Sequence, residues 1–120
     1  MTHSHVALMR RIAATDSTFR LQHDVWTGRC LICDGPVCFD ERTGEGATIE
    51  HILPRSLGGT NNLLNLGIAH TRCNNEKGRH WDPRRRHRTR QDRYVALVQR
   101  LLAERERRLR EDMTEGERIS

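Results

Sequence analysis

Apolar residues recur at helical spacing near the N-terminus of the chain, in the set Val6, Leu8, Met9, Ile12 and Ala13. This pattern predicts a helix. A second helix is expected over 17–26, because Phe19, Gln22 and Trp26 fall roughly on one face and Gly28 can end it. Both helices would belong to an N-terminal helical segment that covers 1–29.

The clearest helical pattern covers 90–113, near the other end of the chain. Its apolar face consists of Tyr94, Leu97, Val98, Leu101, Leu102 and Leu109. The charged face carries Glu104 and Arg108 at four-residue spacing, and then Glu106 and Arg110, and such pairs stabilise a helix. We expect this amphipathic helix to pack on the rest of the domain or on a partner helix.

Short apolar runs alternate with turn-rich loops in the middle of the chain. Residues 30–36 contain two cysteines, a glycine and a proline, which predicts a tight turn. The runs over 48–52 and 64–68 are candidate strands, joined by a loop rich in glycine and asparagine. A further short helix is expected to begin at Thr71, which can cap it, and to end at Gly78.

The composition limits the size of the hydrophobic core. The chain has 120 residues, of which 35% are hydrophobic and only 4% aromatic, whereas 31% are charged. This is enough for one domain with a small core, which a bound metal ion would help to hold together. We divide that domain into the segment 1–29, a central unit 30–79, and a basic linker with the C-terminal helix, 80–120.

The net charge of +5 and the pI of about 9.7 indicate a polyanionic partner. The charge is concentrated, because residues 72–93 hold nine basic side chains against three acidic ones and so account for the whole excess. A solvated, arginine-rich linker is the alternative interpretation of this segment.

The chain contains no apolar run long enough to span a membrane, and its first residues lack the apolar stretch of a secretory signal. We therefore expect a cytoplasmic protein without a membrane partner, in which thiols stay reduced. Four cysteines in such a protein are more often metal ligands than disulfide partners.

Two pairs of ligand-type residues with two-residue spacers predict a structural zinc site. The first pair is Cys30 and Cys33, and the second is His70 and Cys73. Zinc favours thiolate and imidazole ligands in a tetrahedral set, and each spacer lets one tight turn present two ligands. Three alternatives remain open: Cys38 takes the fourth position, the thiols are ordinary buried cysteines, or His70 only forms a hydrogen bond with a neighbour.

Around these pairs stands a set of residues that resembles the HNH nuclease family, in the branch whose active site is flanked by a zinc knuckle. The set comprises Glu50-His51, Pro54, Gly58-Gly59, Asn62, Asn65-Leu66, Cys73-Asn74 and Lys77-Gly78. The resemblance covers 30–78. It implies a small α+β fold, the ββα-metal finger with a structural zinc knuckle, here flanked by N- and C-terminal helices. It also implies hydrolysis of DNA phosphodiester bonds with one divalent ion.

The resemblance assigns roles to four residues. His51 corresponds to the general base that activates water, and Asn65 to the asparagine that keeps this base oriented. Glu50 and Asn74 correspond to the ligands of the catalytic ion. Two departures from the common pattern matter, because Glu50 stands where aspartate is frequent and Asn74 stands where histidine is frequent.

The chemistry of these side chains agrees with the implied roles. Imidazole titrates at about pH 6.5 and is partly neutral at working pH, as a base must be. One carboxylate and one amide oxygen form a sparse ligand set, which suits Mg²⁺ or Mn²⁺ completed by water and substrate phosphate. Because neighbours on a strand point to opposite faces, the backbone must bend near Glu50 and His51 if both serve one site.

Basic side chains around this unit are candidates for contacts with DNA phosphates: Arg55, Lys77, Arg79, Arg84, Arg85 and Arg86. The function that follows is a metal-dependent endonuclease that nicks or cuts DNA. The alternatives are a zinc-stapled nucleic-acid-binding module without catalysis and an accessory factor of a larger DNA-processing complex. The helix at 90–113 is the candidate surface for a homodimer or for such a complex.

Overall fold

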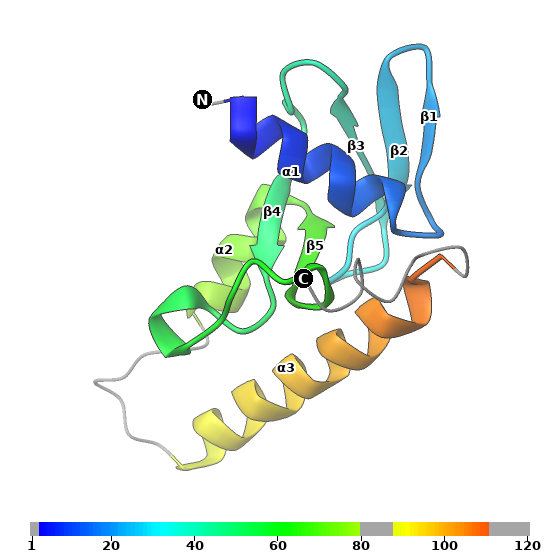
Figure 1. Ribbon diagram of the computed structural model, residues 1–120. Helices are drawn as coiled ribbons and strands as arrows, with labels where there is room; N and C mark the ends of the chain where they lie inside the picture. Colours follow the sequence, from blue (N-terminus) through cyan, green and yellow to red (C-terminus); the bar gives the residue numbers. More distant parts are fainter. Residues whose placement is uncertain (1–2, 80–87, 111–120) are drawn as a thin grey trace.

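The computed structural model describes residues 3–79 and 88–110, which form three helices and two antiparallel sheets (Figure 1). The helices are α1 (His3–Ala14), α2 (Thr71–Arg79) and α3 (Arg88–Arg108). The strands are β1 (Arg20–Gln22), β2 (Val25–Arg29), β3 (Pro36–Asp40), β4 (Thr48–His51) and β5 (Leu66–Ala69). This arrangement confirms the small α+β fold that the sequence predicts. None of the described helices is long and apolar enough to cross a membrane.

The ββα unit expected from the sequence is formed by β4, β5 and α2. The two strands pair antiparallel, with Ile49 opposite Ile68. All four residues of β5 are buried, whereas Cys73 and Lys77 are the buried residues of α2. Since these two lie four residues apart, they define the single face of α2 that meets the strands. The helix ends at Arg79, one residue beyond the predicted end.

The helix predicted over 17–26 is wrong, because β1 and β2 form a hairpin there. The turn residues of the hairpin, His23 and Asp24, have positive φ angles of 52° and 62°, which suit a two-residue turn. Gly28 lies inside β2, where the ring of Phe19 stands 2.5 Å from the position that a Cβ would take. Packing of this ring on the strand therefore outweighs the local helical spacing, and among the described residues 3–29 only α1 is an α-helix.

Two clusters of buried side chains fill the interior of the described residues. The larger lies between α1 and the two sheets and includes Met9, Ile12, Phe19, Phe39, Leu66 and Ile68. The smaller lies under α3 and consists of Leu31, Ile52, Tyr94, Val98 and Leu101. Figure 1 shows α3 running below α2 and the β4–β5 hairpin toward the β1–β2 hairpin. The predicted apolar face is confirmed for Tyr94, Leu97, Val98 and Leu101, whereas Leu102 is exposed. The helix α3 ends at Arg108, before Leu109, rather than near 113.

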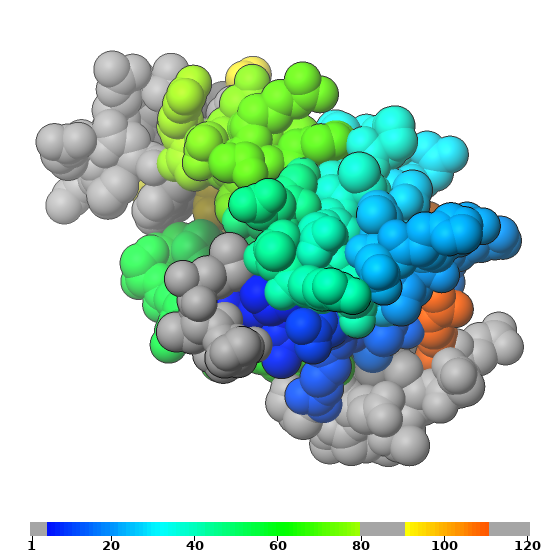
Figure 2. Space-filling model, turned by 90° about the horizontal axis from the view of Figure 1, so that it is seen from above, coloured from blue at the N-terminus to red at the C-terminus, as the bar shows by residue number. Residues whose placement is uncertain are grey.

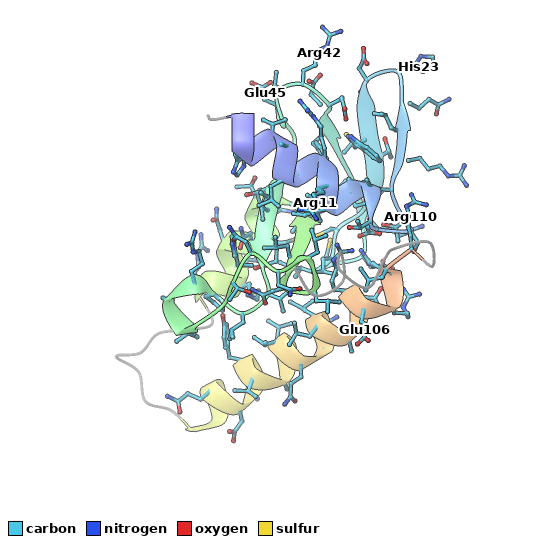
Figure 3. The ribbon with its side chains drawn as sticks, in the orientation of Figure 1. Arg11, His23, Arg42, Glu45, Glu106 and Arg110 are labelled. Atoms are coloured by element: carbon cyan, nitrogen blue, oxygen red, sulfur yellow. The ribbon has the colours of Figure 1, made fainter. Side chains whose placement is uncertain are left out.

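Buried arginines attach the C-terminal end of α3 to the rest of the fold. Arg108 is 1% exposed and pairs with Glu104 at 2.7 Å, as predicted. It also donates hydrogen bonds to the carbonyl oxygen of Arg29 (2.9 Å) and to Asp34 Oδ1 (2.8 Å), in the turn between β2 and β3. Figure 3 shows the next anchor, Arg110, at the base of the β1–β2 hairpin, while His23 lies at the opposite tip. The end of α3 is therefore fixed to the turn that carries the first cysteine pair.

Candidate functional site

The turn between β2 and β3 and the start of α2 bring together Cys30, Cys33, His70 and Cys73. The ligand atoms of these four residues all lie within 4.8 Å of one another. A tetrahedral zinc ion with bonds of about 2.3 Å separates two sulfur ligands by about 3.8 Å, so the groups lie close to the spacing such an ion requires. Figure 2 shows the turn (cyan) beside the residues that lead into α2 (green). The cluster is compatible with a structural zinc ion.

The hydrogen bonds of His70 determine which of its ring nitrogens can bind a metal. Nε2 lies 2.8 Å from the carbonyl oxygen of Pro36 and donates to it, so Nδ1 keeps its lone pair. Nδ1 lies 3.4 Å from Cys33 Sγ and 3.6 Å from Cys73 Sγ. A carbonyl partner on the second nitrogen is common for metal-binding histidines. The hydrogen bond of His70 therefore does not compete with a role as ligand.

The thiols of the cluster differ in acidity, and a cation would favour the thiolate form of each. The N–H of Gly35 lowers the pKa of Cys33 to about 7. Burial, and then the neighbouring Cys30 thiol, raises the pKa of Cys73 to about 11. A divalent ion offsets both burial and mutual repulsion, because it neutralises the thiolates that it binds. Cys38 lies on β3 opposite Thr27 and is exposed, outside the cluster.

A second group of side chains lines an open cleft of about 280 Å³ at the end of β4. The lining residues are Ile49, Glu50, His51, Pro54, Arg55, Asn74, Lys77, Gly78 and Tyr94. The cleft thus brings together three of the four residues assigned to catalysis, namely Glu50, His51 and Asn74. The fourth, Asn65, does not line it.

The two carboxylate oxygens of Glu50 have different surroundings. Oε1 accepts a hydrogen bond from the Lys77 ammonium at 3.2 Å, whereas the buried Oε2 has no hydrogen-bond partner. Burial raises the pKa of this carboxyl group to about 7, although the charge of Lys77 opposes the rise. A buried, unpartnered carboxylate oxygen is costly unless a donor or a cation meets it. Oε2 of Glu50 therefore fits the requirement of a cation ligand.

His51 is the last residue of β4, and an asparagine from the following loop holds its ring. Nε2 of His51 lies 2.8 Å from Asn61 Oδ1. Since an amide oxygen only accepts hydrogen bonds, Nε2 carries the proton and Nδ1 is the basic nitrogen. His51 is half-buried, so Nδ1 can meet a water molecule in the cleft.

Asn65 braces the loop between β4 and β5. Its side chain accepts a hydrogen bond from the N–H of Leu53 (2.8 Å) and donates to the carbonyl oxygens of Leu53 (3.1 Å) and Thr60 (2.9 Å). The loop braced in this way carries His51 just before it and Asn61 near its end. Asn65 touches neither the imidazole nor the cleft, so any effect on the base passes through the loop backbone.

Asn74 stands in the first turn of α2 and faces β4. Its Nδ2 donates a hydrogen bond to the carbonyl oxygen of Ile49 at 3.3 Å. Because the amide nitrogen is used in this way, the orientation of the group is set and Oδ1 is its remaining ligand atom. Asn74, from α2, and Glu50, from β4, therefore offer one oxygen each in the lining of the same cleft.

The assignment of Lys77 to DNA contacts is wrong, because the structure buries this side chain. It is 3% exposed, and its ammonium is bound to Glu50 and to backbone carbonyls inside the protein. Arg55, at the rim of the cleft, and Arg79, at the end of α2, are exposed and remain candidates. The other three candidates, Arg84, Arg85 and Arg86, lie outside the described residues.

Two residues of this site escaped the sequence reasoning. Asn61 carried no signal of its own, because only the conformation of the loop brings it to His51. Tyr94 lines the cleft from α3, with its ring centroid 5.5 Å from the Lys77 ammonium. A signal existed for Tyr94, because it is the first residue of the apolar face of its helix, but that face alone did not indicate which surface it meets.

The comparison with protein families matches residues 30–89, half of the chain, to the family described as HNH endonuclease. The matched segment includes both ligand pairs of the cysteine and histidine cluster and the cleft residues of β4 and α2. No curated protein and no solved structure matches the chain.

Proposed function

Because the chain belongs to the HNH endonuclease family, we propose that it is a metal-dependent endonuclease that hydrolyses phosphodiester bonds in DNA. The observation that carries the proposal is the cleft at the end of β4, which Glu50, His51 and Asn74 line together. A base, an orphaned carboxylate oxygen and an amide oxygen in one open cleft are the groups that water activation and phosphate binding require.

His51 is the general base in this proposal. Its Nε2 is held by Asn61, so Nδ1 takes a proton from water as the water oxygen attacks phosphorus. The bond from phosphorus to the 3′ oxygen then breaks, and that oxygen takes a proton from solvent. The products are ends with a 5′-phosphate and a 3′-hydroxyl group.

Glu50 Oε2 and Asn74 Oδ1 would hold one divalent ion, Mg²⁺ or Mn²⁺, with water and substrate phosphate as further ligands. When bound, such an ion stabilises the negative charge that develops on the phosphate and on the leaving oxygen. The orphaned state of Glu50 Oε2 supports this assignment. Asn74 supports it through the hydrogen bond that orients its amide against Ile49.

Zinc has a structural role in this proposal, held by Cys30, Cys33, His70 and Cys73. The four residues belong to the turn after β2 and to the segment around the start of α2, so the ion would fasten α2 beside the strands. Its binding energy would be largely folding energy. Neither the thiols nor His70 lines the cleft, so the zinc site and the hydrolytic site are separate.

DNA would be held by contacts to phosphates. Arg55 lines the cleft and is exposed, as is Arg79 at the end of α2, and Arg84, Arg85 and Arg86 follow in the chain. Such contacts carry little sequence information and weaken steeply with salt. We therefore expect binding to DNA of unrelated sequences.

The test is nicking of supercoiled plasmid with Mg²⁺ or Mn²⁺, with the zinc-loaded protein and its His51→Ala variant. Positioned proton transfer contributes about 10²–10⁴-fold, so His51→Ala should lose that much rate while still binding DNA. His23→Ala is the matched control, because His23 is exposed at the tip of the β1–β2 hairpin (Figure 3). Nicking by His51→Ala at the wild-type rate, or nicking that persists in excess chelator, would refute the mechanism.

A second candidate function is a zinc-stapled nucleic-acid-binding module without catalysis. The contact between Lys77 and Glu50 favours it. Glu50 carries the only carboxylate among the described residues that line the cleft, and Lys77 already binds one of its two oxygens. The same assay separates the two. DNA binding by a wild-type protein that leaves plasmid intact with every divalent ion tried would establish the binding module instead.

A further inference from the structure

Lys77 is the one lysine in a chain with twenty arginines, and it is buried. Its ammonium has three N–H donors, and three acceptors surround it: Glu50 Oε1 at 3.2 Å, the His51 carbonyl oxygen at 3.2 Å and the Ile52 carbonyl oxygen at 2.8 Å. The ring of Tyr94 lies beyond it, 5.5 Å away. The compact ammonium is thus fully satisfied in a space where the flat, five-donor guanidinium group of arginine does not match the acceptors.

The three acceptors are consecutive along the chain, at the point where β4 ends. The Ile52 carbonyl belongs to the bend at Ile52 and Leu53 that follows β4, and the His51 carbonyl directly precedes this bend. The register of β4 with β5 ends at the pair His51 and Leu66, and beyond it the N–H of Ile52 still donates to the Asn65 carbonyl oxygen at 2.8 Å. Buried carbonyl oxygens at such a strand end need a donor of their own. Lys77 provides it from α2, one turn after Cys73 and three residues after Asn74.

We propose that Lys77 is a positioning residue, which fixes the Glu50 carboxylate and the bend after it so that Oε2 is presented to the divalent ion. This inference rests on the proposed function, because it assigns a task within the same cleft. Lys77 holds Oε1 and thereby sets the rotation of the carboxylate, and it holds the two carbonyls and thereby sets the direction of the chain at His51. It contacts neither phosphate nor water in this role.

The opposite role is physically reasonable and predicts the opposite result. A lysine cation 3.2 Å from a metal-binding carboxylate also repels a divalent ion, so Lys77 would then weaken metal binding. Removing it would increase the affinity for Mn²⁺ if repulsion dominates. Removal would decrease the affinity if positioning dominates, because the freed carboxylate and the freed bend no longer present a fixed ligand. The sign of the change therefore decides between the two roles.

The experiment measures Mn²⁺ binding to zinc-loaded protein by calorimetry, without DNA, for wild type and Lys77→Met. The variant removes the ammonium and keeps most of the side-chain volume. Loss of a group that orients a ligand typically costs about 10–100-fold in metal affinity, and we expect a loss in this range. Arg72→Met, at an exposed position of the same helix, is the matched control and should bind Mn²⁺ like wild type.

Nicking supplies a second readout that a purely structural role would not move. The Mn²⁺ concentration for half-maximal nicking should rise by the same factor in Lys77→Met, while binding of DNA stays unchanged. Lys77→Arg retains the charge and serves if Lys77→Met does not fold. It should also bind Mn²⁺ more weakly, since a guanidinium group cannot direct three N–H groups to these acceptors.

Three results would overturn the inference. The first is tighter or unchanged Mn²⁺ binding by a folded Lys77→Met variant. The second is Mn²⁺ binding by Lys77→Arg with the wild-type affinity. The third is a zinc-loaded wild-type protein that binds no Mn²⁺. The last result overturns the proposed function as well. The first two leave nicking by the wild type intact, so they separate a failure of this inference from a failure of the proposed function.

Discussion

Replacement of Asn65 by alanine should destabilise the protein and slow nicking together. Asn65 is a buried residue, 8% exposed, and its side chain makes three hydrogen bonds to the loop between β4 and β5. Alanine removes all three and leaves the N–H of Leu53 without its partner, 2.8 Å away in the wild type. No other described side chain bonds that N–H, so the loop cannot transfer it to a neighbour.

The magnitude follows from these contacts. A neutral hydrogen bond contributes about 1 kcal/mol net, and a buried donor left unpaired adds to the cost. We therefore expect Asn65→Ala to lower the free energy of unfolding by about 3 kcal/mol. Asn62→Ala is the matched control in the same loop, because the Asn62 side chain makes a single hydrogen bond, to the N–H of Leu64 at 2.8 Å. Loss of this cap should cost about 1 kcal/mol.

The assay is urea unfolding of zinc-loaded protein at 25 °C, followed by plasmid nicking under conditions in which both variants are folded. Asn65→Ala should nick at least about tenfold more slowly, because the released loop carries Asn61 away from His51 and the base loses part of its proton-transfer contribution. Asn62→Ala should nick close to the wild-type rate. Equal unfolding free energies for the two variants, or a folded Asn65→Ala with wild-type nicking, would refute this reasoning.

Cys73→Ser should lose the zinc ion and unfold, whereas Cys38→Ser should keep one zinc per chain in metal analysis; the reverse result would place Cys38 in the site. Asn61→Ala should slow nicking, because it removes the amide oxygen that accepts from Nε2 and holds the His51 ring; nicking at the wild-type rate by the folded variant would show that Asn61 does not orient the base. Hydrogen bonds from Arg107, and then Arg108, lower the pKa of Glu104 from 4.5 to about 2, so its stabilisation is present above pH 4.5 and is lost as pH falls through about 2. Glu104→Gln should therefore cost about 1 kcal/mol near neutral pH in urea unfolding and progressively less as pH falls below 4.5, and a cost that does not decline over this range would contradict the ion pair.

The parts of the fold that sequence reasoning located correctly are those in which local signals and the family motif agree. The strand predicted over 48–52 is β4, and the short helix expected from Thr71 is α2, within one or two residues at each end. Both elements contain or adjoin residues of the family motif, and these residues indicate where the element lies. The ligand pairs lie beside turns, and the Glu50-His51 pair lies at a strand end.

The β1–β2 hairpin shows why the N-terminal half was harder. Phe19, Gln22 and Trp26 fit one face of a helix, and a short window with few apolar residues fits more than one period. The turn at His23 and Asp24 lacks the glycine or asparagine that usually marks positive φ. What decides the structure is the contact of Phe19 with Gly28, between residues nine positions apart.

The buried arginines of α3 could not be predicted from local pattern either. Arg105 and Arg108 look like members of a charged face, since their partners lie far away in the chain. Arg108 bonds to the carbonyl oxygen of Arg29, 79 residues earlier, and Arg105 to Thr15, 90 residues earlier. A distant backbone carbonyl or hydroxyl group carries no signal in the local sequence, so a charged residue of a helix is expected to be exposed. The same assumption placed Lys77 on the DNA-binding surface.

The spacing within α2 explains why the zinc cluster and the cleft depend on each other. A helix of nine residues has little stability in isolation, so α2 keeps its position through what fastens it to the strands. Cys73 fastens its first turn through the ligand cluster, and Lys77, four residues later on the same face, fastens its last turn to the end of β4. Asn74 lies between these two anchors, so the position of its amide oxygen relative to Glu50 is determined by both. In the proposed function, the cysteine and histidine cluster and the buried lysine would thus support the hydrolytic site without touching its reacting atoms. Such a site would need a chain segment much longer than the catalytic residues themselves.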